Sequence, residues 1–246
     1  MSNTISSVTE SLKLLQLVAQ YPNRGLSELA RLSGLNKSRT FRMLCTLVDQ
    51  HFVLQNADGS YQLGHQLLIL GQYARQQTNL IQAVEKVSET LSLRFNENLQ
   101  LRILDHQQVV QIWRKTSTQA LQVRSNVGNQ RELGAGAAGK VLLAFATPDF
   151  QQHYLSQLAP PQAERLATLT TTIQRDGFYL SQGELTAGVY AVAVPIFNAE
   201  QRCIACFSLS VPEVRATETR LQEIIEAMQQ ASKHLSQLLG ANYTSS

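Results

Sequence analysis

Cysteine, long apolar runs and an excess of one charge are all scarce in this sequence, and each shortage excludes a class of protein. The three cysteines among 246 residues are too few for a disulfide scaffold and fit a reducing, cytoplasmic compartment. No run of about 18 apolar residues predicts a membrane span, and the residues after Met1 lack a signal peptide's basic and apolar layout. The net charge of +3 is too weak to identify a nucleic-acid partner by itself. Apolar residues make up 43%, which is enough for a sizeable core.

Residues that carry catalysis or bind metals do not occur at a recognisable spacing. The five histidines show no metal-ligand pattern, and no G-x-S-x-G motif is present. Cys203 and Cys206 form a C-x-x-C pair without a second pair, and an odd separation along a strand points them to opposite faces. We therefore expect packing cysteines, no metal, no cofactor and no enzymatic activity.

The first 64 residues predict three helices and a hairpin. Ser7 and Glu10 have capping-box spacing, Ser27 and Asn36 are good N-caps, and Gly34 suits a left-handed helix end. The turn signal Asn56-Ala57-Asp58-Gly59 separates two extended segments. The predicted helices span 7–20, 27–33 and 37–50, and the extended segments begin at 52 and at 61.

The remaining chain alternates strands with helices, which predicts an α+β protein. A helical stretch over 65–95, with a break near Thr78-Asn79, is expected to link an N-terminal domain (1–64) to a C-terminal domain (96–246). The predicted strands span 99–104, 109–113, 120–124, 189–196 and 204–211. The predicted helices span 137–145, 149–157, 161–174 and 217–239.

The third predicted helix concentrates basic residues on one side. At about 100° per residue, the apolar side holds Phe41, Leu44, Leu47 and Val48, and the opposite side holds Ser38, Arg39, Arg42 and Thr46. Between residues 31 and 46 there are four basic and no acidic residues. Arginine can bind guanine edges or phosphates. A solvated helix face is the alternative, but a short helix, a glycine turn, a basic helix and a hairpin together favour DNA binding.

Residues 25–44 (GLSELARLSGLNKSRTFRML), with Leu47 and the hairpin end Tyr61-Gln62-Leu63-Gly64, resemble the IclR family of bacterial transcriptional regulators. The resemblance covers nearly the whole chain, although His51 stands where the family usually has glycine. It implies an N-terminal winged helix-turn-helix domain, a linker helix and a C-terminal GAF-like effector-binding domain with an antiparallel sheet. The residues expected to bind DNA are Ser27, Lys37, Ser38, Arg39, Thr40, Arg42 and Thr46.

Residues 134–140 (GAGAAGK) match both G-x-G-x-x-G and G-x-x-x-x-G-K, so a nucleotide-binding enzyme is an alternative. Val141 stands where a phosphate loop needs Ser or Thr, and the preceding residues are polar and turn-like instead of a buried strand. The same small residues leave room beside a helix start, whose N–H groups can bind an anion. By resemblance this is the family's ligand loop, with Gly136 replacing a threonine and Gly134 a histidine. A structural glycine turn is the other alternative.

Ser208 and Ser210 lie two apart on a predicted strand and therefore face the same side. By resemblance they line the effector pocket, where two hydroxyls suit a carboxylate; an exposed polar sheet face is the alternative. The resemblance also places Ser181, Val189 and Ala191 at effector-contacting positions. The residues expected to bind effector are Ala135, Gly136, Ala137, Ala138, Ser181, Val189, Ala191, Ser208 and Ser210.

The sequence thus predicts a cytoplasmic, sequence-specific regulator of double-stranded operator DNA that acts as a homodimer or a dimer of dimers. We favour repression over activation, with a small organic acid modulating DNA binding. The rivals are a DNA-binding oligomer without an effector and the nucleotide-binding enzyme.

Overall fold

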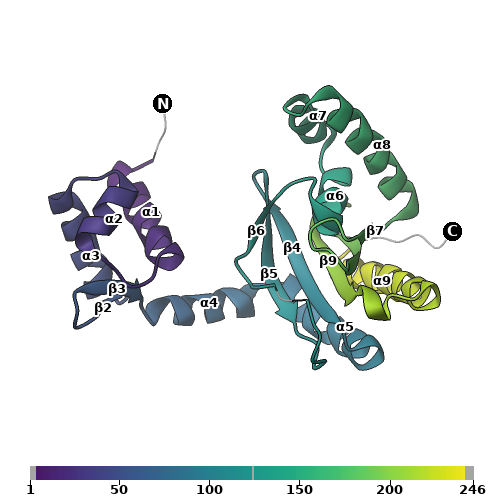
Figure 1. The fold of residues 1–246 in the computed structure, drawn as a ribbon, viewed down its shortest axis with the longest axis horizontal. Helices are drawn as coiled ribbons and strands as arrows, with labels where there is room; N and C mark the ends of the chain where they lie inside the picture. The colour runs from purple at the N-terminus through teal and green to yellow at the C-terminus, as the bar shows by residue number, and fades with distance from the viewer. Residues whose placement is uncertain (1–3, 124, 242–246) are drawn as a thin grey trace. The chain divides into compact units, whose positions relative to one another are not determined.

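The computed structural model describes residues 4–123 and 125–241. It divides into two compact units, Met1–Thr78 and Asn79–Ser246 (Figure 1). The division falls at the predicted helix break and inside the predicted linker, so that the linker's first helix belongs to one unit and its second to the other. That 65–95 acts as a linker remains a prediction.

The N-terminal unit is a winged helix-turn-helix, as predicted. A three-stranded antiparallel sheet of order β1-β3-β2 packs beside three helices. Its elements are α1 (Ser6–Gln20), β1 (Arg24–Gly25), α2 (Leu26–Ser33), α3 (Lys37–Asp49), β2 (Val53–Gln55), β3 (Ser60–Leu63) and α4 (Gln66–Gln77). The buried core consists of Leu14, Val18, Leu29, Met43, Leu44, Val53 and Tyr61.

Two of the predicted caps are wrong. Helix α1 begins at Ser6 with Ile5 as N-cap and no side-chain cap bond, so Ser7 and Glu10 form no capping box. Helix α2 begins one residue earlier than predicted, with Gly25 as N-cap, so Ser27 lies within its first turn. Both errors have one cause, because cap spacing recurs by chance inside helices and tertiary packing decides which residue leaves the helix.

The turn between α2 and α3 is as predicted. Gly34 has φ 69°, the left-handed conformation that ends α2 without a Cβ penalty. The side chain of Asn36 accepts a hydrogen bond of 2.8 Å from the backbone N–H of Arg39 and so caps α3. These two residues fix the direction in which α3 leaves the turn.

His51 explains the family's preference for glycine before the wing. Its φ is 60°, in the left-handed region where glycine carries no Cβ penalty and where, among the other residues, Asn, Asp and His are enriched. Its ring stacks on His65, with centroids 5.1 Å apart. The histidine thus occupies the left-handed conformation that glycine adopts without a Cβ penalty.

The C-terminal unit contains a six-stranded sheet of order β6-β5-β4-β9-β8-β7, in which every neighbouring pair is antiparallel. Its helices are α5 (Asn79–Phe95), α6 (Gly136–Ala144), α7 (Pro148–Ser156), α8 (Pro160–Asp176) and α9 (Glu218–Leu238), with a short 3₁₀ helix at Glu213–Arg215. Its strands are β4 (Asn98–Asp105), β5 (Gln108–Lys115), β6 (Gln130–Glu132), β7 (Tyr179–Gln182), β8 (Val189–Phe197) and β9 (Cys203–Pro212).

The strands bury both faces, each against a different set of helices. On β9, Phe207 and Leu209 belong to the core formed with α5 and α9, whereas Cys206 belongs to the core formed with α6 and α8. Along β9 the residues that face α6 change from apolar to polar after Cys206. The buried polar residues there are Ser208 and Ser210 on β9 and Gln100 on β4. This change from apolar to polar leaves a hydrophilic floor beside α6.

Three strand assignments differ from the sequence prediction. Residues 120–123 form no strand, and Arg124 lies outside the described residues. Strands β6 and β7, at the two edges of the sheet, were not predicted; both are short, and β6 has no fully buried residue. Edge strands of this kind lack the apolar alternation that makes a strand visible in sequence.

Candidate functional site

Helix α3 presents a polar face to solvent. Of the residues expected to bind DNA, all but one are exposed: Ser27 on α2, and Lys37, Ser38, Arg39, Arg42 and Thr46 on α3. Thr40 is the exception, since it is fully buried and its hydroxyl donates to the Asn36 carbonyl at 3.0 Å. Its side chain is therefore part of the capping turn and is unavailable to a ligand.

Phe41 was predicted to pack and does not. Its side chain is 49% exposed, whereas Met43 and Leu44 provide the buried side of α3. The apolar side of the helix is thus narrower than the sequence projection suggests. The Phe41 ring lies at the border of the polar face, although placing residues at 100° steps from the sequence assigns it to the core.

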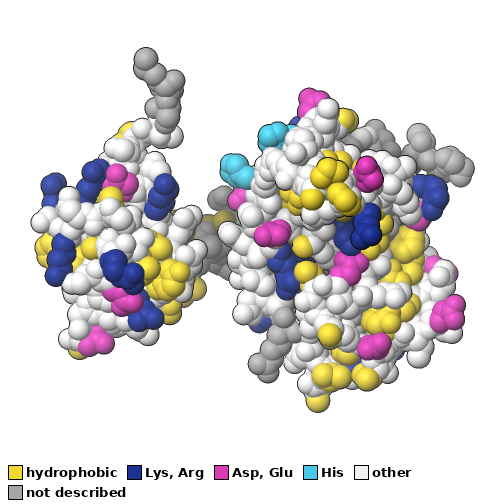
Figure 2. Space-filling model, turned by 45° about the horizontal axis from the view of Figure 1, so that its top comes forward, with side chains coloured by type: hydrophobic (Ala, Val, Ile, Leu, Met, Phe, Trp, Pro, Cys, Tyr) yellow, Lys and Arg dark blue, Asp and Glu magenta, His cyan; other side chains and the backbone are white. Residues whose placement is uncertain are grey.

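Arg39 and Arg42 open onto a groove between α1 and α3. Arg39 Nε lies 2.8 Å from Glu10 Oε2, an ion pair that lacks hydrogen-bond alignment, and 45% of the Arg39 side chain remains exposed. Arg42 has no ion pair among the described residues. The remaining groove residues are Ser7, Val8, Ser11, Leu12, Asn36, Ser38, Met43 and Thr46. Several Lys and Arg side chains stand out on the visible face of this unit (Figure 2).

The hairpin that follows α3 ends in a rigid tip. Gly59 has φ 80°, and the Asp58 carboxylate accepts hydrogen bonds from the backbone N–H and the hydroxyl of Ser60, at 2.9 and 2.6 Å. These bonds lower the pKa of Asp58. The tip therefore carries a fixed negative charge.

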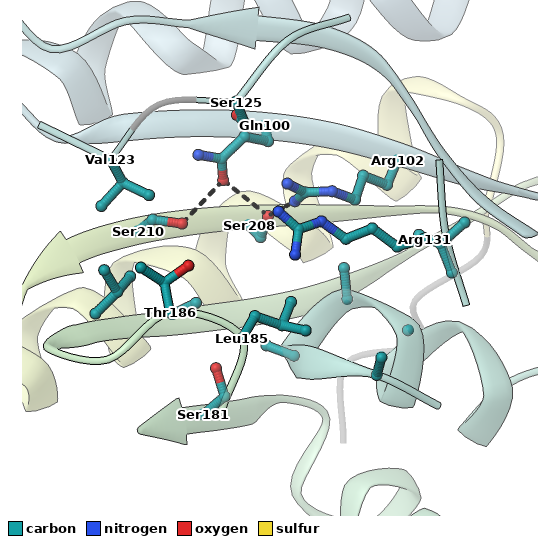
Figure 3. A pocket seen from close by; sticks show the side chains of 17 residues that line it. Gln100, Arg102, Val123, Ser125, Arg131, Ser181, Leu185, Thr186, Ser208 and Ser210 are labelled. Atoms are coloured by element: carbon teal, nitrogen blue, oxygen red, sulfur yellow. Dashed lines mark hydrogen bonds between the residues drawn. The ribbon is translucent and has the colours of Figure 1, made fainter. Parts of the chain in front are cut away.

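The residues predicted to bind effector converge on one cavity of about 70 Å³ in the C-terminal unit (Figure 3). Pairing of β7, β8 and β9 aligns Ser181 with Ala191 and Ala191 with Ser210. Eight of the nine line the cavity: Ala135, Ala137, Ala138, Ser181, Val189, Ala191, Ser208 and Ser210. Segments more than 70 positions apart in sequence are thereby brought together.

Gly136 is the ninth residue, and it lies behind the cavity wall. It has φ 60°, and a Cβ built there would clash with the Leu185 side chain, 2.8 Å from its Cγ. Leu185 occupies the space that a larger residue at 136 would need. Glycine therefore stands at position 136, where the resemblance implies a threonine, and the Leu185 side chain lines the cavity in its place.

The floor of the cavity is a hydrogen-bonded polar network. The hydroxyls of Ser208 and Ser210 donate to Gln100 Oε1 at 3.1 and 3.2 Å. Arg102 donates to the Ser208 hydroxyl at 2.9 Å and to Gln111 Oε1 at 2.8 Å. Both serines are at most 8% exposed, so the alternative of an exposed polar sheet face is wrong.

Sequence reasoning missed the two arginines of this cavity. Arg102 on β4 and Arg131 on β6 both line it. Burial, with a smaller contribution from the charge of Arg131, lowers the pKa of Arg102 to about 10. A signal for Arg102 was available, because Gln100 and Arg102 alternate with Leu99, Leu101 and Ile103 in a predicted strand. Arg131 gave none, since β6 was not predicted.

The glycine-rich loop lacks the geometry of a nucleotide site. It follows a strand after all, but β6 is an antiparallel edge strand without a buried residue, whereas a dinucleotide fold needs a buried parallel strand. Lys140 Nζ pairs with Glu184 Oε2 at 2.5 Å and donates to the Tyr179 hydroxyl at 3.2 Å. The lysine that would reach a phosphate is therefore already bound elsewhere.

Cys203 and Cys206 have the environment of packing residues, whereas Cys45 is exposed. Burial raises the pKa of the Cys203 thiol to about 12 and raises that of Cys206 as well. Within the described part of the chain, no three His, Cys, Asp or Glu side chains cluster as metal ligands would. None of the described helices has both the length and the apolar character to cross a bilayer.

Comparison with known families assigns both units. Residues 7–57 match the IclR helix-turn-helix domain, and residues 72–237 match the bacterial transcriptional regulator IclR C-terminal domain. The regulator XynR of Escherichia coli is 30% identical over 246 residues, covering 96% of this chain and 98% of its own. KipR of Bacillus subtilis is 28% identical, covering 98% and 99%, and the transcriptional repressor IclR of E. coli is 26% identical, covering 96% and 90%.

Solved structures share the fold. An IclR transcriptional regulator from Alicyclobacillus acidocaldarius superimposes with a TM-score of 0.87 at 23% identity, covering 96% of this chain and all of that one. An IclR homologue from Microbacterium hydrocarbonoxydans, solved with 4-hydroxybenzoate, gives 0.80 at 23% identity over 95% and 99% of the two chains. The protein is thus a DNA-binding transcriptional regulator with an effector domain, and not an enzyme. The chain belongs to the IclR family.

Proposed function

We propose that this regulator represses transcription by inserting α3 into the major groove of an operator, and that a small carboxylate in the cavity alters its affinity for DNA. One observation carries the proposal: the second helix of the helix-turn-helix exposes Ser38 and Arg42, and Arg42 has no ion-pair partner among the described residues. An exposed guanidinium can bind a guanine edge bidentately or a phosphate.

The side chains around Arg42 suit a DNA duplex. Lys37 and Ser38 lie at the start of α3, where helix-turn-helix proteins contact base edges. Phe41 offers an apolar surface to a thymine methyl group. Arg39 lies toward α1 and is held by Glu10, so we assign it a phosphate contact.

The rest of the proposal follows from the architecture of such regulators. Helix-turn-helix proteins read two half-sites, which supports a homodimer or a dimer of dimers acting in the cytoplasm. Repression is supported by relatives that are named repressors, among them E. coli IclR. A carboxylate effector is supported by the cavity's composition and by the relative solved with 4-hydroxybenzoate.

The first test replaces Arg42 with alanine. We expect operator affinity to fall by about 1–3 kcal/mol, or roughly 5- to 150-fold, while the fold is retained because Arg42 is exposed. The measurement is a salt-controlled titration of fluorescent operator, isolated by selection from random duplexes with the wild-type protein.

The matched control is Lys13→Ala, which removes the same charge from an exposed position on α1 outside the groove. We expect the control to change affinity less than twofold. Equal losses in both variants would mean that only net charge matters, and an unchanged Arg42→Ala titration would remove α3 from the interface.

A further inference from the structure

The effector cavity carries two positive charges and no negative one. Seventeen described residues line it, and the charged ones are Arg102 and Arg131. Neither forms an ion pair among the residues that the structure describes. The nearby acid Glu184 is not a counter-ion, because it already binds Lys140 at 2.5 Å.

A third source of positive potential reaches the same space. Helix α6 begins at Gly136 with no side-chain cap, and Ala135, Ala137 and Ala138 of its start line the cavity. The first N–H groups of a helix have no partner within the helix and favour a negative ligand. The two guanidiniums and this helix end therefore belong to one electropositive chamber (Figure 3).

Arg102 is held by hydrogen bonds within the cavity. Ser208 and Gln111 each accept one of its hydrogen bonds, and Gln100 receives the hydroxyl protons of both serines. The serine protons are thus already used within the protein. The serines position Arg102, and the guanidinium remains to bind the acid, in contrast to the sequence expectation that the serines would do so.

We infer that the effector is a compact dicarboxylate, with one carboxylate on Arg102 and the other on Arg131. The inference rests on the proposed function, since it specifies the acid that enters the proposed effector cavity. A single carboxylate would pair with one guanidinium and leave the other in the cavity wall without a counter-ion. Two carboxylates balance both charges and can form the bidentate pairs that arginine favours.

The size of the chamber restricts the acid to a short chain. A cavity of about 70 Å³ holds on the order of five water molecules by the same measure. That space suits dicarboxylates of roughly four to six carbons. The hydroxyls of Ser181 and Thr186 on the opposite wall can accept or donate to a hydroxyl or keto group of the acid.

The test measures ligand binding to the full-length protein by calorimetry and thermal shift. The probes are succinate, glutarate, adipate, malate and 2-oxoglutarate, each with its half-ester and diamide at equal ionic strength. We expect at least one dicarboxylate to bind at least tenfold more tightly than its half-ester, and the diamides not to bind. Arg131→Gln should lower affinity for that dicarboxylate at least tenfold and reduce its preference over the half-ester to less than threefold.

Arg202→Gln is the matched control, since Arg202 is exposed in the same unit and pairs with Glu200 away from the cavity. It should leave binding unchanged. The inference is overturned if none of the five acids binds at millimolar concentration, if a half-ester or diamide binds equally well, or if Arg131→Gln binds as the wild type does. Operator titration of the same preparation distinguishes a failure of this inference from a failure of the proposed function. If the protein binds operator DNA but no dicarboxylate, only the inference about the effector is overturned.

Discussion

Arg42 on α3 and Arg102 on β4 carry the same guanidinium in opposite surroundings. Arg42 is exposed to water, whereas Arg102 is held by Ser208 and Gln111 at the floor of a cavity. A solvated cation carries no desolvation penalty in the absence of a partner, so it suits the binding of a large polyanion such as DNA at the protein surface. A desolvated cation is destabilising until a counter-ion arrives, so it couples ligand binding to the stability of its domain.

The two units differ in their cores as well. Seven buried residues from three helices and two strands stabilise the N-terminal unit, whereas two large clusters sandwich the sheet of the C-terminal unit. A small domain buries a smaller fraction of its surface and is correspondingly marginal. The same loss of stabilising free energy should therefore unfold the N-terminal unit, and so abolish DNA binding, more readily than it unfolds the C-terminal unit that holds the cavity.

The largest expected effect comes from Leu44→Ala, which empties a fully buried position of the small core. Such truncations destabilise by about 2–5 kcal/mol. We expect the N-terminal unit to unfold at a lower temperature and operator binding to be lost, while the C-terminal transition in calorimetry stays unchanged. Leu209→Ala, which removes an equally buried leucine from β9, is the contrasting control. If Leu44→Ala shifts both transitions together, the units do not unfold independently.

An intermediate effect is expected from Arg102→Met. Without ligand, replacing a desolvated charge by an apolar chain should raise the free energy of unfolding by about 1 kcal/mol, even though Gln111 and Ser208 lose a donor. Burial holds the pKa of Arg102 near 10 in the folded chain, well below its ordinary value, so the folded state disfavours the charged form. This penalty is complete below pH 10 and decreases as the pH rises from there toward the ordinary pKa of arginine, so the gain in stability is at full size at neutral pH.

Chemical denaturation of the Met variant at pH 7 provides the measurement, with Arg42→Met as the exposed counterpart, which should change stability by less than about 0.5 kcal/mol. If the free energy of unfolding of Arg102→Met instead falls by more than about 1 kcal/mol, the hydrogen bonds of the guanidinium stabilise the fold, and the contrast between the two arginines disappears.

The smallest effect belongs to Glu10→Gln, which breaks the ion pair with Arg39. The Arg39 side chain of this pair is 45% exposed and that of Glu10 is 25% exposed, so the pair is partly screened by water and contributes about 1 kcal/mol or less to stability. Removing an acid beside the polar face of α3, which we propose binds DNA, should tighten operator binding about twofold at low salt, and the gain should vanish at high salt. Glu28→Gln, which breaks the Arg24 pair, is the comparison. A loss of affinity in Glu10→Gln would show that Glu10 holds Arg39 in its DNA-binding conformation.

The sequence predicted α3 well because the signals that define this helix are local. Gly34 and Asn36 act within a single turn, and the period of α3 follows from chain geometry. The same reasoning misplaced Phe41 and Thr40, since the width of a buried stripe depends on how neighbouring helices meet it. A capping box at Ser7 was wrong for a similar reason, because Glu10 is bound by Arg39, which lies 29 positions away.

By itself, the sequence determined the α+β class, the turn before α3, the break at Thr78 and the alternation along β4, β8 and β9, because each depends on contacts within a few residues. The edge strands β6 and β7 were not among the elements that it predicted. Only the tertiary structure decided which alternating residues face a cavity, since Gln100, Arg102, Arg131 and Ser208 meet through strand pairing over as many as 108 positions. Burial also lowers the pKa of Arg102, which its residue type alone does not predict, because desolvation depends on all the groups packed around the side chain.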